Sequence, residues 1–289
     1  LALDAKGEVQ FQELRFKVAG QWRSLVWPLT GPPQVESAQG ELSAEGVPTD
    51  YRFQLTAEVQ GPEIPKGRWT LSGQGSDQAV RGVQFKGQTL EGVLQGNANV
   101  AWLPAVSWQA TLSGEGLNPG AQWKELPGKL NLRLKSDGGL ENDQLRANLL
   151  LEELTGTLSG QALRGNADVA VQNQDLTIRT LRLNAGANRV EATGALAQRW
   201  DLRWTVDAPQ LQTLVPGVSG AINSTGTLSG SRDRPQVAAN FTVRNLRQGD
   251  TQIQQLRGEA RVDVGGTARS QVKITGEGLT LGGQRWRTV

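Results

Sequence analysis

Alternation of apolar and polar residues runs from one end of the chain to the other. Such a period of two places successive side chains on opposite faces of an extended segment, so each run predicts a β-strand with one apolar and one polar face. At about 12 residues for a strand and its turn, 289 residues predict on the order of twenty strands. The clearest runs have their apolar members at Phe53, Leu55, Ala57 and Val59, at Val106, Trp108, Ala110 and Leu112, at Leu130, Leu132 and Leu134, at Trp200, Leu202, Trp204 and Val206, and at Ala239, Phe241 and Val243.

Turn residues separate these runs, and helical periodicity is scarce. Gly, Asn and Asp cluster at 137–139, 186–188 and 249–250, where we expect turns. Two segments, 118–128 and 207–217, begin at an Asn or Asp near a proline and end in Pro-Gly, the punctuation of a short helix. Both are too short to be stable alone, so they must pack on the end of a sheet.

A sheet with a single apolar face must bury that face against something. The alternation slips by one residue between Ile178 and Leu181, which predicts a β-bulge near Thr180. Glycine interrupts the apolar positions repeatedly, and within strands it marks bends or close backbone approach. Repeated bends would curl one sheet into a trough with an apolar lining, whereas two flatter sheets would cover each other as a sandwich. Composition leaves both architectures open.

The inventory of reactive groups argues against an enzyme. The chain has no Cys and no His, which excludes thiol nucleophiles, Cys/His metal sites and imidazole acid–base catalysis. The adjacent carboxylates Glu152 and Glu153 point to opposite faces of an extended strand, so they cannot share a site. The glycine clusters at 114–116 and 276–278 fit no phosphate-binding pattern and are predicted to be turns or bends. We therefore expect no catalytic residues, no metal and no cofactor.

Charge is balanced and dispersed. The net charge is +2, and acids are interleaved with bases, as in Arg232-Asp233-Arg234. A nucleic-acid surface requires a concentrated basic stripe, so we expect no nucleic-acid partner.

The ends of the sequence look like cuts in a longer protein. The chain starts inside an alternating pattern at Leu1, contains no Met, and shows no signal peptide or membrane-spanning run. Repetition is present but irregularly spaced, since residues 94–101 return at 163–170 with six identities in eight. No linker is visible, so residues 1–289 are predicted to be a single continuous repetitive segment.

The order of several short motifs resembles a known family. They are Leu126-Pro127-Gly128, Ser136-Asp137-Gly138, Leu154-Thr155-Gly156-Thr157-Leu158-Ser159-Gly160, Val190-Glu191-Ala192-Thr193-Gly194, Trp200-Asp201-Leu202-Arg203-Trp204, Asp207-Ala208-Pro209, Leu214-Val215-Pro216-Gly217 and Gly226-Thr227-Leu228-Ser229-Gly230. Their order is similar to that in the central periplasmic region of the TamB family, AsmA-like members of the bridge-like lipid transfer superfamily. The similarity is greatest at about 115–265.

The resemblance implies an all-β fold, a long curved sheet that forms a U-shaped β-taco groove with an apolar lining and a few short helical turns. It implies a periplasmic location in a Gram-negative bacterium, with the parent protein anchored in the inner membrane. The implied function is to shield acyl chains and carry phospholipid between the inner and outer membranes. The alternative is a scaffold for assembly and translocation of outer-membrane β-barrel proteins. An Omp85-family barrel is the implied partner, through regions outside this chain.

The candidate groove lining consists of apolar members of the alternating runs in the best-matched region and just after it. Their other interpretation is the ordinary core of a sheet. A charge at such a position, as in Val171→Asp or Trp204→Glu, is expected to block acyl chains. The candidates are Val169, Val171, Leu176, Ile178, Leu202, Trp204, Val206, Phe241, Val243, Val262, Val264, Val272 and Ile274.

Overall fold

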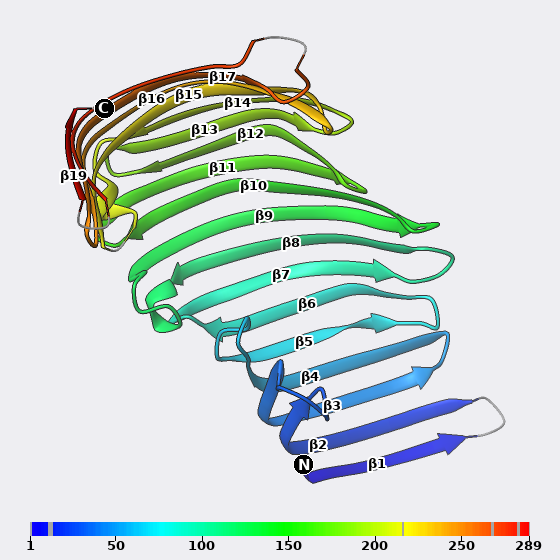
Figure 1. Cartoon of the computed structure of the whole chain (residues 1–289). Helices are drawn as coiled ribbons and strands as arrows, with labels where there is room; N and C mark the ends of the chain where they lie inside the picture. Colours follow the sequence, from blue (N-terminus) through cyan, green and yellow to red (C-terminus); the bar gives the residue numbers. More distant parts are fainter. Residues whose placement is uncertain (1, 11–13, 216, 267–268, 282–283, 289) are drawn as a thin grey trace. The chain divides into compact units, whose positions relative to one another are not determined.

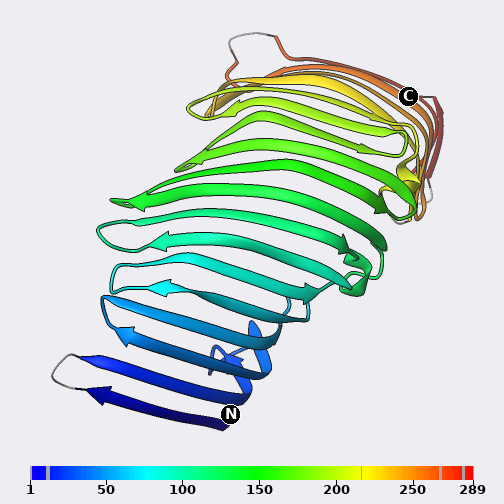
Figure 2. The same cartoon turned by 180° about the vertical axis from the view of Figure 1, so that it is seen from behind.

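A computed structural model describes the chain except residues 1, 11–13, 216, 267–268, 282–283 and 289. The described residues form nineteen β-strands and two short 3-10 turns, so the prediction of an all-β fold with about twenty strands is confirmed. The chain divides into two compact units, residues 1–147 and 148–289. Figures 1 and 2 show the strands of each unit running side by side as a curved ribbon sheet.

In the first unit, each strand pairs antiparallel with the strand that follows it in the chain. The ladder is open, because β1 and β9 make no pairing with each other among the described residues. Its strands are β1 (Ala2–Gln10), β2 (Arg15–Trp27), β3 (Val35–Val47), β4 (Asp50–Gln60), β5 (Gly67–Gly75), β6 (Ala79–Thr89), β7 (Gly92–Ala101), β8 (Val106–Leu117) and β9 (Gly128–Glu141).

The second unit repeats this plan. From β11 to β19 each strand again pairs antiparallel with the next, and the described residues give no pairing between β11 and β19. The unit boundary falls inside β10 (Gln144–Leu158). The others are β11 (Gln161–Gln172), β12 (Asp175–Ala185), β13 (Asn188–Leu196), β14 (Arg199–Ala208), β15 (Val218–Ser231), β16 (Arg234–Gln248), β17 (Thr251–Asp263), β18 (Gln271–Leu281) and β19 (Gln284–Thr288).

The alternation of apolar and polar residues in the sequence corresponds to the two faces of the sheet, one half-buried and one exposed. In β9, Leu130, Leu132 and Leu134 are half-buried, whereas the intervening Asn131, Arg133 and Lys135 are exposed. The same pattern holds in β4 and β14, so the predicted strands are confirmed with their predicted sidedness.

Register shifts bend the strands. The predicted bulge is confirmed, since β12 shifts between Ile178 and Leu181 against both of its neighbours. The glycine cluster at 114–116 also lies at a shift, between Gly114 and Leu117 of β8. Bulges increase local twist and bend a strand, and they recur in both units.

One predicted turn is wrong. Residues 137–139 lie within β9, and the chain reverses instead at Asn142 and Asp143, both of which have positive φ. Gly138 is inside the strand because the indole of Trp108 lies over it, in space that a Cβ would occupy. The predicted turns at 186–188 and 249–250 are confirmed, except that Asn188 already begins β13.

The two expected helices are single 3-10 turns, η1 (Pro119–Ala121) and η2 (Leu211–Thr213). Asn118 caps η1, with its side-chain oxygen accepting from the amides of Gly120 and Gly128 at 3.0 Å. Asn188, at the start of β13, is 2% exposed. Its side chain holds the backbone of Gln210, just before η2, by donating to the Gln210 carbonyl and accepting from the Gln210 amide. Pro216 lies outside the described residues. No helix in the described part of the chain has the length and apolarity that crossing a bilayer needs.

Within each unit, the described residues form no second layer over the apolar face. The accessible surface is 18818 Å², whereas a compact monomer of 31.1 kDa exposes roughly 12,000 Å². Among the described residues, the fully buried apolar side chains number eleven, and five of them are alanines. The sandwich that the composition left open is therefore not the architecture of either unit. Each is a single curved sheet whose apolar face stays accessible.

Candidate functional site

The strand register places twelve of the thirteen predicted lining residues on one face of the second unit. Val171 lies opposite Leu176, and Val169 lies opposite Ile178. Ile178 and Leu202 both face Gly194 across their shared ladders. In the same way, Phe241 and Ile274 are the partners of Gly258 on the two strands that flank it. The bulge at 179–180 adds one residue between Ile178 and Leu181. Leu176 and Ile178 therefore point to the same face of the sheet as Leu181 and Leu183.

Val264 is the exception, because it follows the end of β17 and lies in the turn that leads to β18. It is 63% exposed, and its amide donates to the carbonyl of Pro235. The alternation continues one residue past the point where pairing stops, which is why the sequence pattern included it. Val272 and Ile274 are on the lining face of β18 but are also largely exposed.

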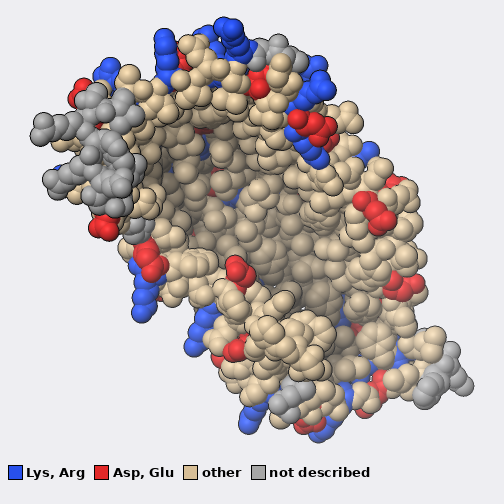
Figure 3. All heavy atoms as spheres, viewed as in Figure 1, with Lys and Arg blue, Asp and Glu red and all other residues tan. Residues whose placement is uncertain are grey.

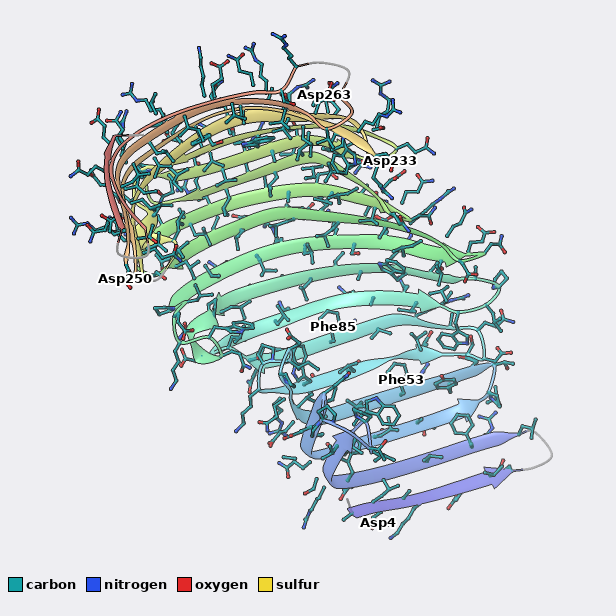
Figure 4. All side chains as sticks on the ribbon, in the orientation of Figure 1. Asp4, Phe53, Phe85, Asp233, Asp250 and Asp263 are labelled. Atoms are coloured by element: carbon teal, nitrogen blue, oxygen red, sulfur yellow. The ribbon has the colours of Figure 1, made fainter. Side chains whose placement is uncertain are left out.

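The first unit carries an equivalent face that the site prediction omitted. Its apolar residues come from the same kind of alternation, for example Leu55 opposite Leu42 and Leu71. Figure 4 labels two of its aromatic residues, Phe53 of β4 and Phe85 of β6. The alternating pattern alone was sufficient to find this face, but the prediction was confined to residues 169–274.

The described lining of β1–β9 and β11–β18 has no charged residue. Following the Cα partners through β1–β9 and β11–β18, every Asp, Glu, Lys and Arg falls on the opposite face, in a turn, or at a bulge. In Figure 3, most of the visible charged side chains lie along the edges of each unit, and the surface between them is largely uncharged. A surface of this kind can hold apolar matter without burying a charge.

Charges on the outer face form exposed ion pairs. The carboxylate of Glu191 forms ion pairs with Arg189 at 2.6 Å and with Arg182 at 3.7 Å. Arg179 forms an ion pair with Asp168 at 2.6 Å at the β12 bulge. Such solvent-exposed pairs each contribute at most about 1 kcal/mol. They keep the outer face soluble and add little to the stability of the sheet.

Tryptophan side chains of the lining lie flat across the next strand. Trp204 of β14 faces Gly226 of β15, and a Cβ at that glycine would overlap the indole ring. The indole nitrogen donates to Ser224, two residues before the glycine, at 3.2 Å. Buried indole N–H groups need a partner, and here the serine supplies one within the lining itself.

This arrangement of Trp, Gly and Ser, called here the indole cradle, occurs three times among the described side chains. Trp22 of β2 lies over Gly40 and donates to Ser37 at 2.9 Å, across a bulge in β3. Trp108 of β8 lies over Gly138 and donates to Ser136 at 3.1 Å. The three tryptophans are on β2, β8 and β14, so the cradle recurs at every sixth strand.

Other aromatic residues of the lining use glycine in the same way without a hydrogen bond. Tyr51 lies over Gly75, Trp69 over Gly87, Phe85 over Gly96 and Phe241 over Gly258, each aromatic on one strand and each glycine opposite it on the next. The strand glycines therefore accommodate rings, in addition to bending the sheet.

Among the described residues, no three His, Cys, Asp or Glu side chains lie close enough together to share a metal ion. The polar side chains that the lining does present, such as Ser37 and Thr89, are hydrogen-bonded within the protein. No buried side-chain nitrogen or oxygen among the described residues lacks a partner.

Comparisons with known proteins agree on one family. A sequence model described as "TamB, N-terminal domain" matches residues 1–289. The curated protein "Translocation and assembly module subunit TamB" of Haemophilus influenzae is 24% identical over 245 residues, which cover 84% of this chain and 19% of that protein. This chain thus spans about a fifth of the length of that relative. No solved structure matches the chain.

Proposed function

Because this chain belongs to the family of TamB N-terminal domains, we propose that it is a stretch of a periplasmic groove that carries the acyl chains of phospholipids between the inner and outer membranes. In this proposal the chain is no enzyme, and its parent protein is anchored in the inner membrane. The name of the Haemophilus relative supports a role in a translocation and assembly module. The partner of that module is proposed to be an Omp85-type outer-membrane barrel, bound through regions outside this chain.

The uncharged, uncovered lining is the observation that carries the proposal. An acyl chain in water exposes apolar surface at a cost of about 0.8 kcal/mol per CH₂, so a ~16-carbon tail costs on the order of 10 kcal/mol. A continuous apolar face removes most of this cost at every position along the sheet. Transfer between neighbouring positions is then nearly neutral, and net movement requires a gradient or an external source of energy.

The lining is suited to passage more than to tight binding. Its side chains are aliphatic or aromatic, and its serine and threonine hydroxyls already have partners in the protein. A site that selected one ligand would present a few polar groups aimed at it. An acyl chain meets no such group here, so nothing retains it at one position.

Photocrosslinking in cells tests the proposal, with the full-length protein carrying a probe at Val237 or at Ala238. Val237 is on the lining face of β16, between Leu228 and Val262, and its neighbour Ala238 points to the outer face. We expect phospholipid to be captured at Val237 and not at Ala238. Leu55 and Gln54 form the matching pair in the first unit.

Each outcome has a distinct meaning. Lipid at Val237 and Leu55, with none at their controls, supports the conduit and also the prediction that the chain acts as one continuous segment. Equal capture of lipid on both faces indicates nonspecific contact and overturns the proposal. Capture of nascent outer-membrane protein without lipid replaces it with the assembly role, in which strands bind by β-augmentation.

A further inference from the structure

We propose that the glycine of each indole cradle is a clearance residue, which holds its tryptophan flat so that an acyl chain can pass over it. The inference rests on the proposed conduit function and assigns Gly40, Gly138 and Gly226 a positioning role in it. Glycine at these places is required by the space above the backbone, because a Cβ would overlap the ring.

Size makes the position of the indole decisive. Trp is the largest side chain of the lining, and an indole standing upright on a strand would extend into the hollow that the sheet encloses. Side chains on a sheet stand roughly perpendicular to it unless something holds them down. In the cradle, the missing Cβ lets the ring lie on the backbone of the next strand, and the serine fixes its edge.

The serine bond has a second consequence for the lining. An indole N–H left free in an apolar environment costs free energy unless it finds an acceptor. Because Ser37, Ser136 and Ser224 each accept this hydrogen bond, the tryptophans present their apolar faces to the groove. Each tryptophan thereby adds apolar contact area without extending into the groove and without leaving its indole N–H unpaired.

A methyl group at the glycine should therefore raise the indole and obstruct the groove without adding charge. Gly40→Ala is the test, because the first unit offers a matched control. Gly20 is on the same lining face of β2, opposite Leu42, but a Cβ there would meet its nearest non-neighbouring atom, the Asp4 carbonyl oxygen, at 3.6 Å. Gly20→Ala thus adds the same methyl group where no ring has to move.

The experiment measures phospholipid captured by a probe at Leu55 in the full-length protein in cells. We expect Gly40→Ala to lower capture at least about fivefold, the factor that corresponds to about 1 kcal/mol, and to capture clearly less lipid than Gly20→Ala, which adds the same methyl group to the lining without moving a ring. Adding Trp22→Leu to Gly40→Ala removes the ring that obstructs, so capture should return to the level of Trp22→Leu alone. Equal protease resistance of all variants confirms that each is folded.

The controls separate this inference from the function on which it rests. If the parent protein captures no lipid at Leu55, the conduit itself is wrong. If it captures lipid but Gly40→Ala does so equally well, the conduit stands and the clearance role is refuted. A loss in Gly40→Ala that Trp22→Leu does not relieve also refutes it, because the defect then comes from the backbone of β3.

Discussion

Replacing Val171 by Asp puts a carboxylate on the lining of β11, where the side chain is half-buried and faces Leu176. In the empty groove the carboxylate reaches water, so the fold loses only the partial burial of one valine, about 1 kcal/mol or less. With an acyl chain above it, the same group is desolvated. A carboxylate within hydrocarbon costs about 2.5–3.5 kcal/mol on insertion scales, which lowers occupancy roughly 60- to 400-fold.

The control is the adjacent residue. Ala170→Asp introduces the same charge one position earlier, on the outer face opposite Thr177. Lipid capture at Val237 in the full-length protein should fall at least about tenfold in Val171→Asp, since the open side of the groove lets the carboxylate keep part of its hydration. It should stay unchanged in Ala170→Asp. A folded Val171→Asp protein with normal capture refutes the reasoning, as does an equal loss in both variants.

Three further predictions concern stability. Asn188→Ala removes three hydrogen bonds that tie Gln210 and Thr213 of the η2 segment to the sheet. Hydrogen exchange at 210–215 should therefore accelerate about 30-fold or more, the equivalent of ~2 kcal/mol, and unchanged exchange would show that other contacts hold the segment. Leu117→Ala, at a bulge and 6% exposed, should lower the free energy of unfolding by about 2–3 kcal/mol in urea, and a loss below ~1 would mean the site collapses freely. Asp201→Ala breaks a 3.3 Å pair with Arg203 in which both side chains are about two-thirds exposed; we expect a change under ~0.5 kcal/mol, contradicted by a larger, salt-sensitive loss.

The parts of this fold that depend on local pattern could be predicted from the sequence. Alternation identified the strands and their faces, and a slip in its phase located the bulge near Thr180. The order of short motifs identified the family, which the whole-chain match confirms. These features are readable because a period of two and its interruptions are properties of single strands.

Features that depend on register between strands could not be predicted. Gly138 was expected to be part of a turn, since glycine after Asp is a turn signal, but its role depends on Trp108, thirty residues earlier. Likewise, nothing in the sequence of β14 shows that Trp204 donates to Ser224, because that bond requires the β14–β15 alignment. Val264 is a related case, because alternation in the sequence does not show that β17 ends at Asp263.

Pairing only between consecutive strands has a consequence for how the protein assembles. In each unit the described ladders join strands that are neighbours in the chain, so each pairing closes a local hairpin, such as Val47 with Asp50. Contact order is correspondingly low for an all-β protein, and slow long-range closure is avoided. A chain of this kind can fold directionally, each strand docking on the one before it as it emerges. The length of the sheet can then change by whole hairpins during evolution, because adding or removing one disturbs no pairing between strands that are distant in the chain.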